Sequence, residues 1–203
     1  MPSPPSLHGL PPVPLSQEEV RAIRENAVCL HGPEAVHRAL DRMAAAITAE
    51  LGDSLPVVLC VLTGGIIPTG HILTRLSFPL ETDYLHATRY RGETSGRQVH
   101  WMSKPEISLQ GRTVLVIDDI LDEGHTLEQV LEFCRDAGAS RVFSAVLIEK
   151  QHDRRVPGIA ADFVGLQVED KYVFGFGMDY RNYLRNLNGI YALGQAPIWK
   201  PEQ

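Results

Sequence analysis

Apolar and polar positions follow helical spacing along the first quarter of the chain. Ser16 followed three residues later by Glu19 is a capping box, which predicts a short helix that runs to about Val28. Pro33 suits a first helical turn, and apolar residues then recur every three or four positions as far as residue 51. We therefore expect a second, longer helix over residues 33–51.

Short runs of β-branched and apolar residues follow, and helical segments separate several of them. Strands are predicted over residues 57–62, 80–88, 98–102, 113–117, 142–148 and 163–168, and further helices over 67–76 and 126–137. A wholly apolar run such as 57–62 is typical of a strand covered on both faces, as in a parallel sheet. Strands that alternate with helices are joined by right-handed crossovers. The pattern therefore predicts an α/β fold with a doubly wound, mainly parallel sheet and flanking helices.

The composition is that of an ordinary globular domain, with 44% apolar and 22% charged residues among 203. A net charge of −6 argues against duplex nucleic acid as a partner, because such binders usually show a basic face. Three widely spaced cysteines suit neither a disulfide framework nor a zinc site, which favours a reducing, cytoplasmic location. No apolar run approaches the ~20 residues that span a bilayer. We therefore expect no membrane partner and, since no basic and apolar leader precedes residue 15, no secretory signal.

Residues 114–126 carry the most informative pattern, because a buried apolar strand leads directly into carboxylates. Asp118 and Asp119 follow the strand, and Asp122 opens a turn that contains Gly124 and ends in a predicted helix. Ligands bind at the carboxyl edge of such sheets. The free N–H groups of a helix N-terminus suit a phosphate, and the hydroxyl of Thr126 adds a donor.

The paired acids require a different ligand from the turn. Asp118 and Asp119 would repel a phosphate, so ribose hydroxyls or Mg²⁺ are the candidates. The alternative is that both are ordinary turn residues and that Asp122 is a helix cap. Three aspartates beside a glycine turn favour the binding site over that alternative.

The segment resembles the phosphoribosyl-pyrophosphate motif of type I phosphoribosyltransferases. The shared pattern is an apolar run, two acids, two apolar residues, Asp, a variable residue, Gly, and Thr two residues later. The resemblance implies that Asp118 and Asp119 contact the ribose and hold Mg²⁺, and that Asp122 accepts a proton from the purine. It also implies a 5′-phosphate pocket formed by Glu123, Gly124, His125 and Thr126.

Two positions depart from the motif, since relatives usually carry a small hydroxyl residue at 123 and Lys at 125. An acid beside a phosphate is unfavourable, so we expect Glu123 to point outward and to contribute its N–H. His125 still favours an anion when it is protonated.

Further segments extend the resemblance over residues 57–188. Gly64 and Gly65 match the pyrophosphate loop, although many relatives have a basic residue where this chain has Thr63. The polar stretch 89–97 matches a flexible catalytic loop that would close over the substrates and exclude water.

Residues 170–188 resemble the base-binding segment of the hypoxanthine-guanine subfamily. There Tyr172 would stack on the purine and the backbone of Val173 would read its edge, while Asp179 would hold a second Mg²⁺ and Arg185 would meet pyrophosphate. Lys150 would donate to the purine O6, which favours 6-oxopurines over adenine because Lys cannot accept a hydrogen bond. The phenylalanines at 174 and 176 are expected in the core.

The resulting hypothesis is a purine-salvage phosphoribosyltransferase that converts hypoxanthine or guanine and phosphoribosyl pyrophosphate to IMP or GMP and pyrophosphate. A proline-rich flexible tail over residues 1–15 is expected to precede a single domain, 16–203, with a core of about 55–170 and a small hood built from the terminal segments. A homodimer or homotetramer is expected.

Other functions remain open at this point. One is a regulatory protein that senses phosphoribosyl pyrophosphate, although the chain lacks a basic surface for nucleic acid. Others are transferases for xanthine, adenine or orotate. A Rossmann-type nucleotide binder is disfavoured because no Gly-x-Gly-x-x-Gly follows the first strand.

Overall fold

The computed structural model describes residues 14–89 and 99–194 of the chain. In chain order its elements are α1 (Gln17–Glu25), β1 (Ala27–His31), α2 (Pro33–Leu51), β2 (Val57–Leu62), α3 (Ile66–Leu73), β3 (Glu81–Arg89), β4 (Val99–Ser103), β5 (Thr113–Leu121), α4 (His125–Asp136), β6 (Arg141–Gln151), β7 (Phe163–Glu169), β8 (Val173–Phe174) and β9 (Ile190–Leu193). The capping box at Ser16 and Glu19 is confirmed, and Pro33 begins α2 as predicted. Residue 89 of the predicted loop 89–97 ends β3, and the rest of that loop and the chain before residue 14 lie outside the described residues.

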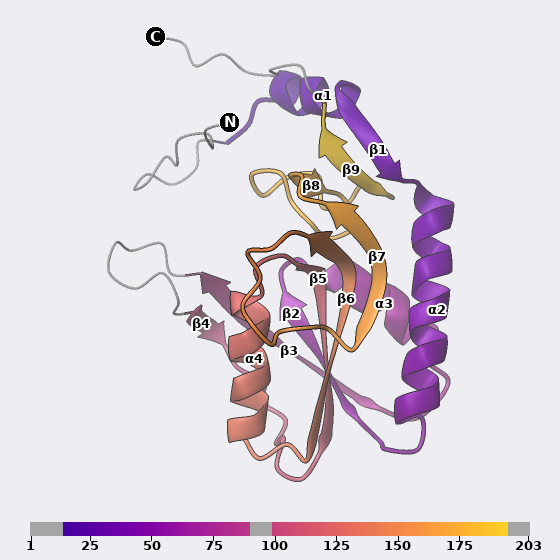
Figure 1. Cartoon of the computed structure of the whole chain (residues 1–203), viewed down its shortest axis with the longest axis vertical. Helices are drawn as coiled ribbons and strands as arrows, with labels where there is room; N and C mark the ends of the chain where they lie inside the picture. The colour runs from indigo at the N-terminus through magenta and orange to yellow at the C-terminus, as the bar shows by residue number, and fades with distance from the viewer. Residues whose placement is uncertain (1–13, 90–98, 195–203) are drawn as a thin grey trace.

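The main sheet of the described chain has the strand order β4-β3-β2-β5-β6-β7 (Figure 1). Neighbouring strands are parallel except β3 and β4, which are antiparallel. Helices α2 and α3 cover one face and α4 covers the other (Figure 1). The predicted doubly wound, mainly parallel α/β fold is therefore confirmed.

The central strand β5 serves two cores, one on each face of the sheet. Leu115 and Ile117 pack on the side of α2 and α3, and Val114 and Val116 pack with residues of α4. All four are fully buried. Side chains alternate between the faces of a strand, so an unbroken apolar run fills both cores.

Both β5 and β6 continue further than their apolar runs predicted. Strand β5 was expected to end at residue 117, but its ladder with β6 still pairs Asp118 with Val146 and Leu121 with Glu149. The acids therefore lie within a hydrogen-bonded ladder, because backbone pairing does not require apolar side chains. The extension fixes the backbone of the acidic segment.

A small second sheet, in the order β1-β9-β8, is formed by segments from the two ends of the described chain. It lies beyond the arrowheads of β6 and β7 (Figure 1). Its core contains Ile23, Phe174 and Leu184. The burial of Phe174 and Phe176 is confirmed.

The prediction of one helix through Val28 is wrong. Helix α1 ends at Glu25, and β1 then pairs antiparallel with β9. This partner lies far away in the chain, so local helical spacing does not reveal it.

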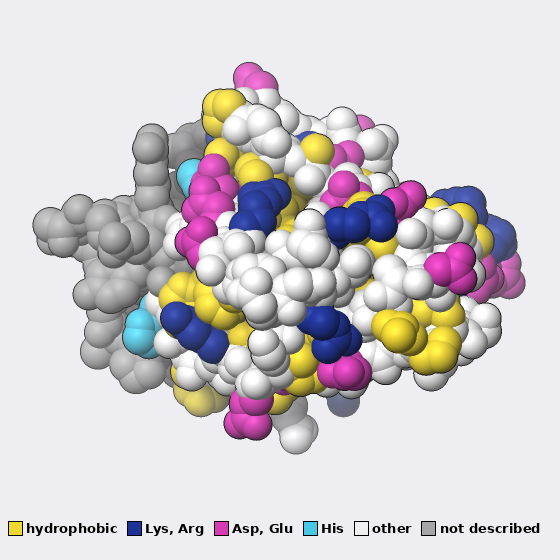
Figure 2. Space-filling model, turned by 90° about the horizontal axis from the view of Figure 1, so that it is seen from below, with side chains coloured by type: hydrophobic (Ala, Val, Ile, Leu, Met, Phe, Trp, Pro, Cys, Tyr) yellow, Lys and Arg dark blue, Asp and Glu magenta, His cyan; other side chains and the backbone are white. Residues whose placement is uncertain are grey.

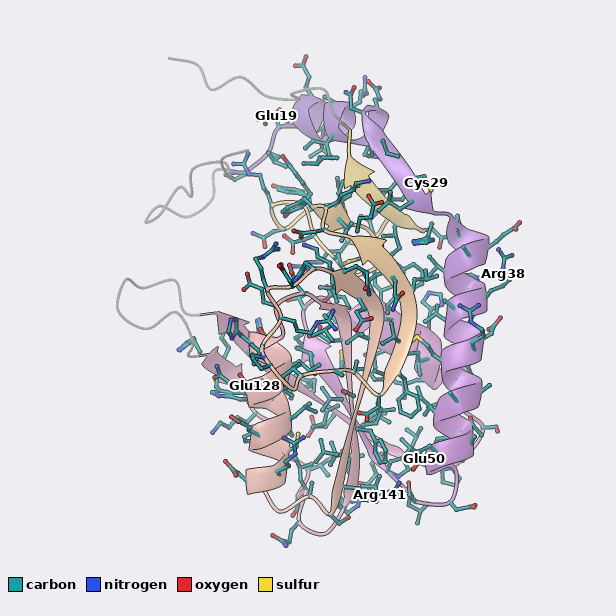
Figure 3. All side chains as sticks on the ribbon, viewed as in Figure 1. Glu19, Cys29, Arg38, Glu50, Glu128 and Arg141 are labelled. Carbon is teal, nitrogen blue, oxygen red and sulfur yellow. The ribbon has the colours of Figure 1, made fainter. Side chains whose placement is uncertain are left out.

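The opposite end of the molecule is held by polar contacts. Glu50 at the end of α2 and Arg141 at the start of β6 form an ion pair near the lower end (Figure 3). Figure 2 shows this end with basic side chains interspersed among acidic and apolar ones. No helix among the described residues is long and apolar enough to cross a membrane.

Leu115→Ala is expected to lower the free energy of unfolding by about 2–5 kcal/mol, because it opens a cavity in a fully buried position. Urea denaturation monitored by circular dichroism measures the change. Val28→Ala, at an exposed position of β1, is the control and is expected to change stability by less than about 0.5 kcal/mol. Equal losses in both variants would contradict this packing scheme.

Candidate active site

A cavity of about 170 Å³ lies at the carboxyl ends of β5 and β6, below β8. It is lined by Asp119, Ile120, Asp122, Lys150, Tyr172, Val173, Met178 and Asp179. Six of these residues were predicted as site residues from three separate segments of the sequence. A larger hollow of about 700 Å³ beside α1 contains none of the predicted residues. The smaller cavity is therefore the candidate site.

The Gly64–Gly65 turn allows the loop after β2 to contact the acidic strand. A Cβ atom on Gly64 would lie 1.9 Å from Asp119 Oδ2, and one on Gly65 would lie 2.5 Å from the Val61 carbonyl oxygen. The peptide bond between Leu62 and Thr63 is cis. Only glycine at position 64 leaves the Asp119 carboxylate in its observed place.

A second glycine contact joins the predicted base-binding segment to the same loop. Gly177 has φ of +109°, and a Cβ there would lie 2.2 Å from the Gly64 carbonyl oxygen. Arg185 donates to the Gly177 carbonyl oxygen at 2.7 Å, and its second terminal nitrogen lies 2.8 Å from Asp179 Oδ1. Arg185 is therefore next to the predicted pyrophosphate loop, although it does not line the cavity.

The paired aspartates carry an electrostatic cost. Burial, followed by the neighbouring carboxylate of Asp119, raises the pKa of Asp118 well above its ordinary value. Burial also raises the pKa of Asp119, while a hydrogen bond with Asp118 and the charge of Arg185 oppose this shift. The Asp119 backbone N–H donates to Asp118 Oδ1 at 2.8 Å. Two adjacent acids that are hard to ionise favour a cation or hydroxyl donors as ligands.

Asp122 lies between two nitrogen donors. Lys150 Nζ is 2.9 Å from its Oδ2, and His152 Nε2 is 2.7 Å from its Oδ1. Burial raises the pKa of Asp122, but the hydrogen bonds from Lys150 and His152 outweigh it, so the pKa lies below its ordinary value. Both carboxylate oxygens of Asp122 therefore have a hydrogen-bond partner.

His152 was not among the predicted site residues. Its side chain is 3% exposed. It follows Lys150 by two positions at an extended strand end, and residues at this spacing share a side of the chain. This two-residue spacing from Lys150 is the sequence feature from which His152 could have been predicted as a site residue.

The turn before α4 has the shape that was expected of a phosphate loop. Gly124 caps the helix with φ of +93°, and the amides of His125 and Thr126 follow it at the helix N-terminus. The Glu123 side chain is one-third exposed, 3.8 Å from His125 Nε2 and 3.9 Å from Arg154 Nε. Glu123 thus lies between the imidazole of His125 and the guanidinium of Arg154, whose charge offsets its own, and does not simply point to solvent.

Tyr172 and Val173 differ in exposure as their proposed roles require. Tyr172 is 51% exposed, and its hydroxyl donates to the Asp179 carbonyl oxygen at 3.1 Å. Val173 is buried and belongs to β8. An aromatic face is therefore available at the wall of the cavity.

The oxygen donors of the site suit Mg²⁺. Among the described residues, no lysine or arginine donates a hydrogen bond to Asp118 or Asp119. A divalent cation would favour the ionised form of both acids. Asp179 is already engaged, because Oδ1 pairs with Arg185 and Oδ2 accepts the Asn182 N–H at 2.7 Å. Asp118 and Asp119 therefore fit a metal better than Asp179 does.

Comparison with known proteins identifies the class. Residues 30–181 match the family model of the phosphoribosyl transferase domain. The chain belongs to this phosphoribosyltransferase family, as its acidic motif predicted.

Within the family, the chain is similar to enzymes for 6-oxopurines. It is 30% identical over 167 residues to the hypoxanthine-guanine-xanthine phosphoribosyltransferase of Tritrichomonas foetus. The aligned region covers 82% of this chain and 91% of that protein. It is 32% identical over 164 residues to the hypoxanthine-guanine phosphoribosyltransferase of Bacillus subtilis strain 168, with 80% and 91% covered. A solved hypoxanthine phosphoribosyltransferase from Staphylococcus aureus superposes with a TM-score of 0.79 at 26% identity, over 84% of this chain and 93% of that one.

Gly64→Ala is expected to displace the Asp119 carboxylate, because the added methyl group would occupy its position. A crystal structure of the variant measures the displacement. Gly70→Ala on α3 is the matched control, since a Cβ there meets no atom within 4 Å. An unmoved Asp119 in Gly64→Ala would contradict the proposed contact.

Asp118→Asn is expected to stabilise the protein at neutral pH in the absence of divalent metal. The folded-state pKa of Asp118 is raised, so the wild type loses stability as pH rises from the ordinary aspartate value of about 3.9 through the raised folded value. The amide is not subject to this loss, so the variant should be more stable than the wild type above that window. Urea denaturation at pH 4 and pH 8 with EDTA measures it. A gain that is as large at pH 4 would show that ionisation is not the cause.

Proposed function

We propose that this chain transfers the phosphoribosyl group of phosphoribosyl pyrophosphate to hypoxanthine or guanine and releases pyrophosphate. The observation that carries the proposal is the cavity that brings together Asp119, Asp122, Lys150 and Tyr172. The names of the relatives in the phosphoribosyltransferase family support the same reaction. It is a purine-salvage reaction of a pentosyltransferase.

Asp122 is the proposed proton acceptor. As the sugar C–O bond breaks and a C–N bond to the purine forms, the imidazole N–H of the base must lose its proton. Asp122 lines the cavity at the start of the phosphate turn. Its low pKa makes it ionised at neutral pH and therefore able to accept a hydrogen bond from the base.

Lys150 is the proposed specificity residue. Its ammonium group can only donate, so it favours the carbonyl O6 of a 6-oxopurine. Without a base in the site it pairs with Asp122 Oδ2 at 2.9 Å. A turn of Lys150 toward O6 would free that oxygen and weaken the interaction that keeps the pKa of Asp122 low.

The remaining residues position the substrates. The half-exposed ring of Tyr172 would stack on the purine, and the backbone of Val173, which lines the same cavity, would read its edge. Amides of residues 123–126 at the start of α4 would hold the 5′-phosphate. Amides of Gly64 and Gly65, with Arg185 nearby, would hold pyrophosphate.

Asp118 and Asp119 are the residues proposed to hold Mg²⁺ and the ribose hydroxyls, with Asp179 as a further ligand. When it is bound, Mg²⁺ neutralises charge on the pyrophosphate leaving group. The acids themselves orient the ribose so that the anomeric carbon faces the base.

Xanthine is a second candidate base, because the Tritrichomonas foetus relative is named for hypoxanthine, guanine and xanthine. A regulatory sensor of phosphoribosyl pyrophosphate would bind the sugar phosphate without turnover. Assembly as a homodimer or homotetramer and a cytoplasmic location remain predictions.

Pyrophosphate release with hypoxanthine, guanine, xanthine, adenine and orotate, each with and without Mg²⁺, tests the proposal. We expect turnover with hypoxanthine or guanine that depends on Mg²⁺. Binding of phosphoribosyl pyrophosphate without turnover of any base would support the sensor instead. Preference for adenine would contradict the role of Lys150.

Asp122→Asn is expected to lower kcat by about 100-fold or more, because the amide cannot accept the proton. The Kd for phosphoribosyl pyrophosphate, measured by calorimetry with Mg²⁺, should change little. Asp153→Asn, an exposed position beyond the end of β6, is the control. Unchanged turnover in Asp122→Asn would remove this residue from the role.

A further inference from the structure

His152 is a buried histidine that the proposed reaction does not yet use. It follows the end of β6, and its Nε2 lies 2.7 Å from Asp122 Oδ1. Its side chain is 3% exposed. A polar ring buried against the proposed proton acceptor is well placed to act on the reaction through Asp122.

The hydrogen bonds of the ring fix its tautomer. The Arg154 backbone N–H donates to His152 Nδ1 at 3.2 Å. A backbone N–H can only donate, so Nδ1 carries a lone pair. In the neutral ring the proton is then on Nε2, which faces Asp122. His152 is therefore a neutral donor to the carboxylate.

The two oxygens of Asp122 have different partners. Oδ1 accepts from the imidazole of His152, whereas Oδ2 pairs with the ammonium group of Lys150. A hydrogen bond from a charged donor is about twice as strong as one from a neutral donor. The neutral donor thus holds the carboxylate while opposing its basicity less than a second cation would.

The segment that carries His152 is itself held in place. Arg155 donates to the Lys150 carbonyl oxygen at 2.7 Å, and Arg154 makes two bonds to Asp170, at 2.7 and 3.0 Å. The Val156 N–H donates to the Glu123 carbonyl oxygen at 2.8 Å. These contacts therefore hold the backbone around His152 between the proposed base site and the proposed phosphate turn.

A metal site is the competing interpretation of these groups. Ligand atoms of Asp122, His152 and Asp170 lie within 4.8 Å of one another. However, Lys150 Nζ lies 2.9 Å from Asp122 and 3.9 Å from Asp170, and Arg154 pairs with Asp170. Two cationic side chains already neutralise the carboxylates, so the cluster is an ion-pair network.

We propose that His152 is a positioning residue that holds Asp122 through Oδ1 and thereby directs Oδ2 toward the purine. This inference rests on the proposed function. When Lys150 turns to the base, Oδ2 becomes the oxygen that takes the proton. The purine N–H bond breaks, its electron pair stays on the purine, and the proton is held on Oδ2. His152 keeps its own proton throughout.

Replacement of His152 by Leu and by Gln separates donation from packing. Leu fills the space without a donor, and Gln offers a neutral N–H at a similar reach. His152→Leu should lower kcat by about 10- to 100-fold, because the Asp122 carboxylate is no longer held with Oδ2 toward the purine. The KM for phosphoribosyl pyrophosphate should be nearly unchanged. His152→Gln should recover most of the loss. Gln151→Leu, at the exposed neighbouring position, is the control.

A second readout does not depend on turnover. Nitrogen NMR of ¹⁵N-histidine-labelled protein, with the His152 signals assigned by their absence in His152→Gln, should show the Nε2–H tautomer. An Nδ1–H tautomer would overturn the proposal.

The kinetic outcomes separate the two hypotheses. If the wild type releases pyrophosphate and His152→Leu keeps its kcat, the positioning role alone is refuted. Equal losses in the Leu and Gln variants would indicate packing and also refute it. If the wild type turns over none of the five bases, the proposed function fails, and the positioning role fails with it.

Discussion

The site depends on two close contacts that only glycine permits, one with a side chain and one with the backbone. Gly64 places the loop after β2 against Asp119, and Gly177 places the base-binding segment against the carbonyl oxygen of Gly64. A side chain at position 64 would displace the Asp119 carboxylate, and one at position 177 would meet the backbone carbonyl of Gly64, since both Cβ positions lie well inside van der Waals distance of these atoms. The two contacts hold three separate parts of the chain at one edge of the sheet, where the cavity forms.

The second constraint is electrostatic. Asp118 and Asp119 occupy the paired end of β5, where burial raises the pKa of both acids and the carboxylate of Asp119 raises that of Asp118 further. A protein selected for stability alone would avoid such a pair. Their position beside the glycine loop is consistent with a site that is completed when cation and substrate bind, because these ligands would favour the ionised acids.

The chemistry of Asp122 is divided between two partners of different character. Lys150 is a cation that the proposed base would draw away, and His152 is a buried neutral donor held by its own backbone contact. Strand β6, next to the acidic segment, carries Lys150, and His152 follows its end. Strands β5 and β6 extend together by several residues beyond their apolar runs, which brings these groups to the same level of the sheet.

The sequence alone determined the strands of a mainly parallel sheet, the two long helices and the acidic segment, because each follows from local spacing or from a contiguous motif. Most of the other cavity residues were predicted through the family resemblance. It also placed Phe174 and Phe176 in the core. Tertiary structure decided the pairing of β1 with β9, the length of β5, the position of Glu123 between His125 and Arg154, and the contact of His152 with Asp122. These features join residues that are distant in the chain or depend on which groups meet in space. The local pattern of polar and apolar residues does not specify such contacts, and for His152 it gave only a shared side of the chain with Lys150.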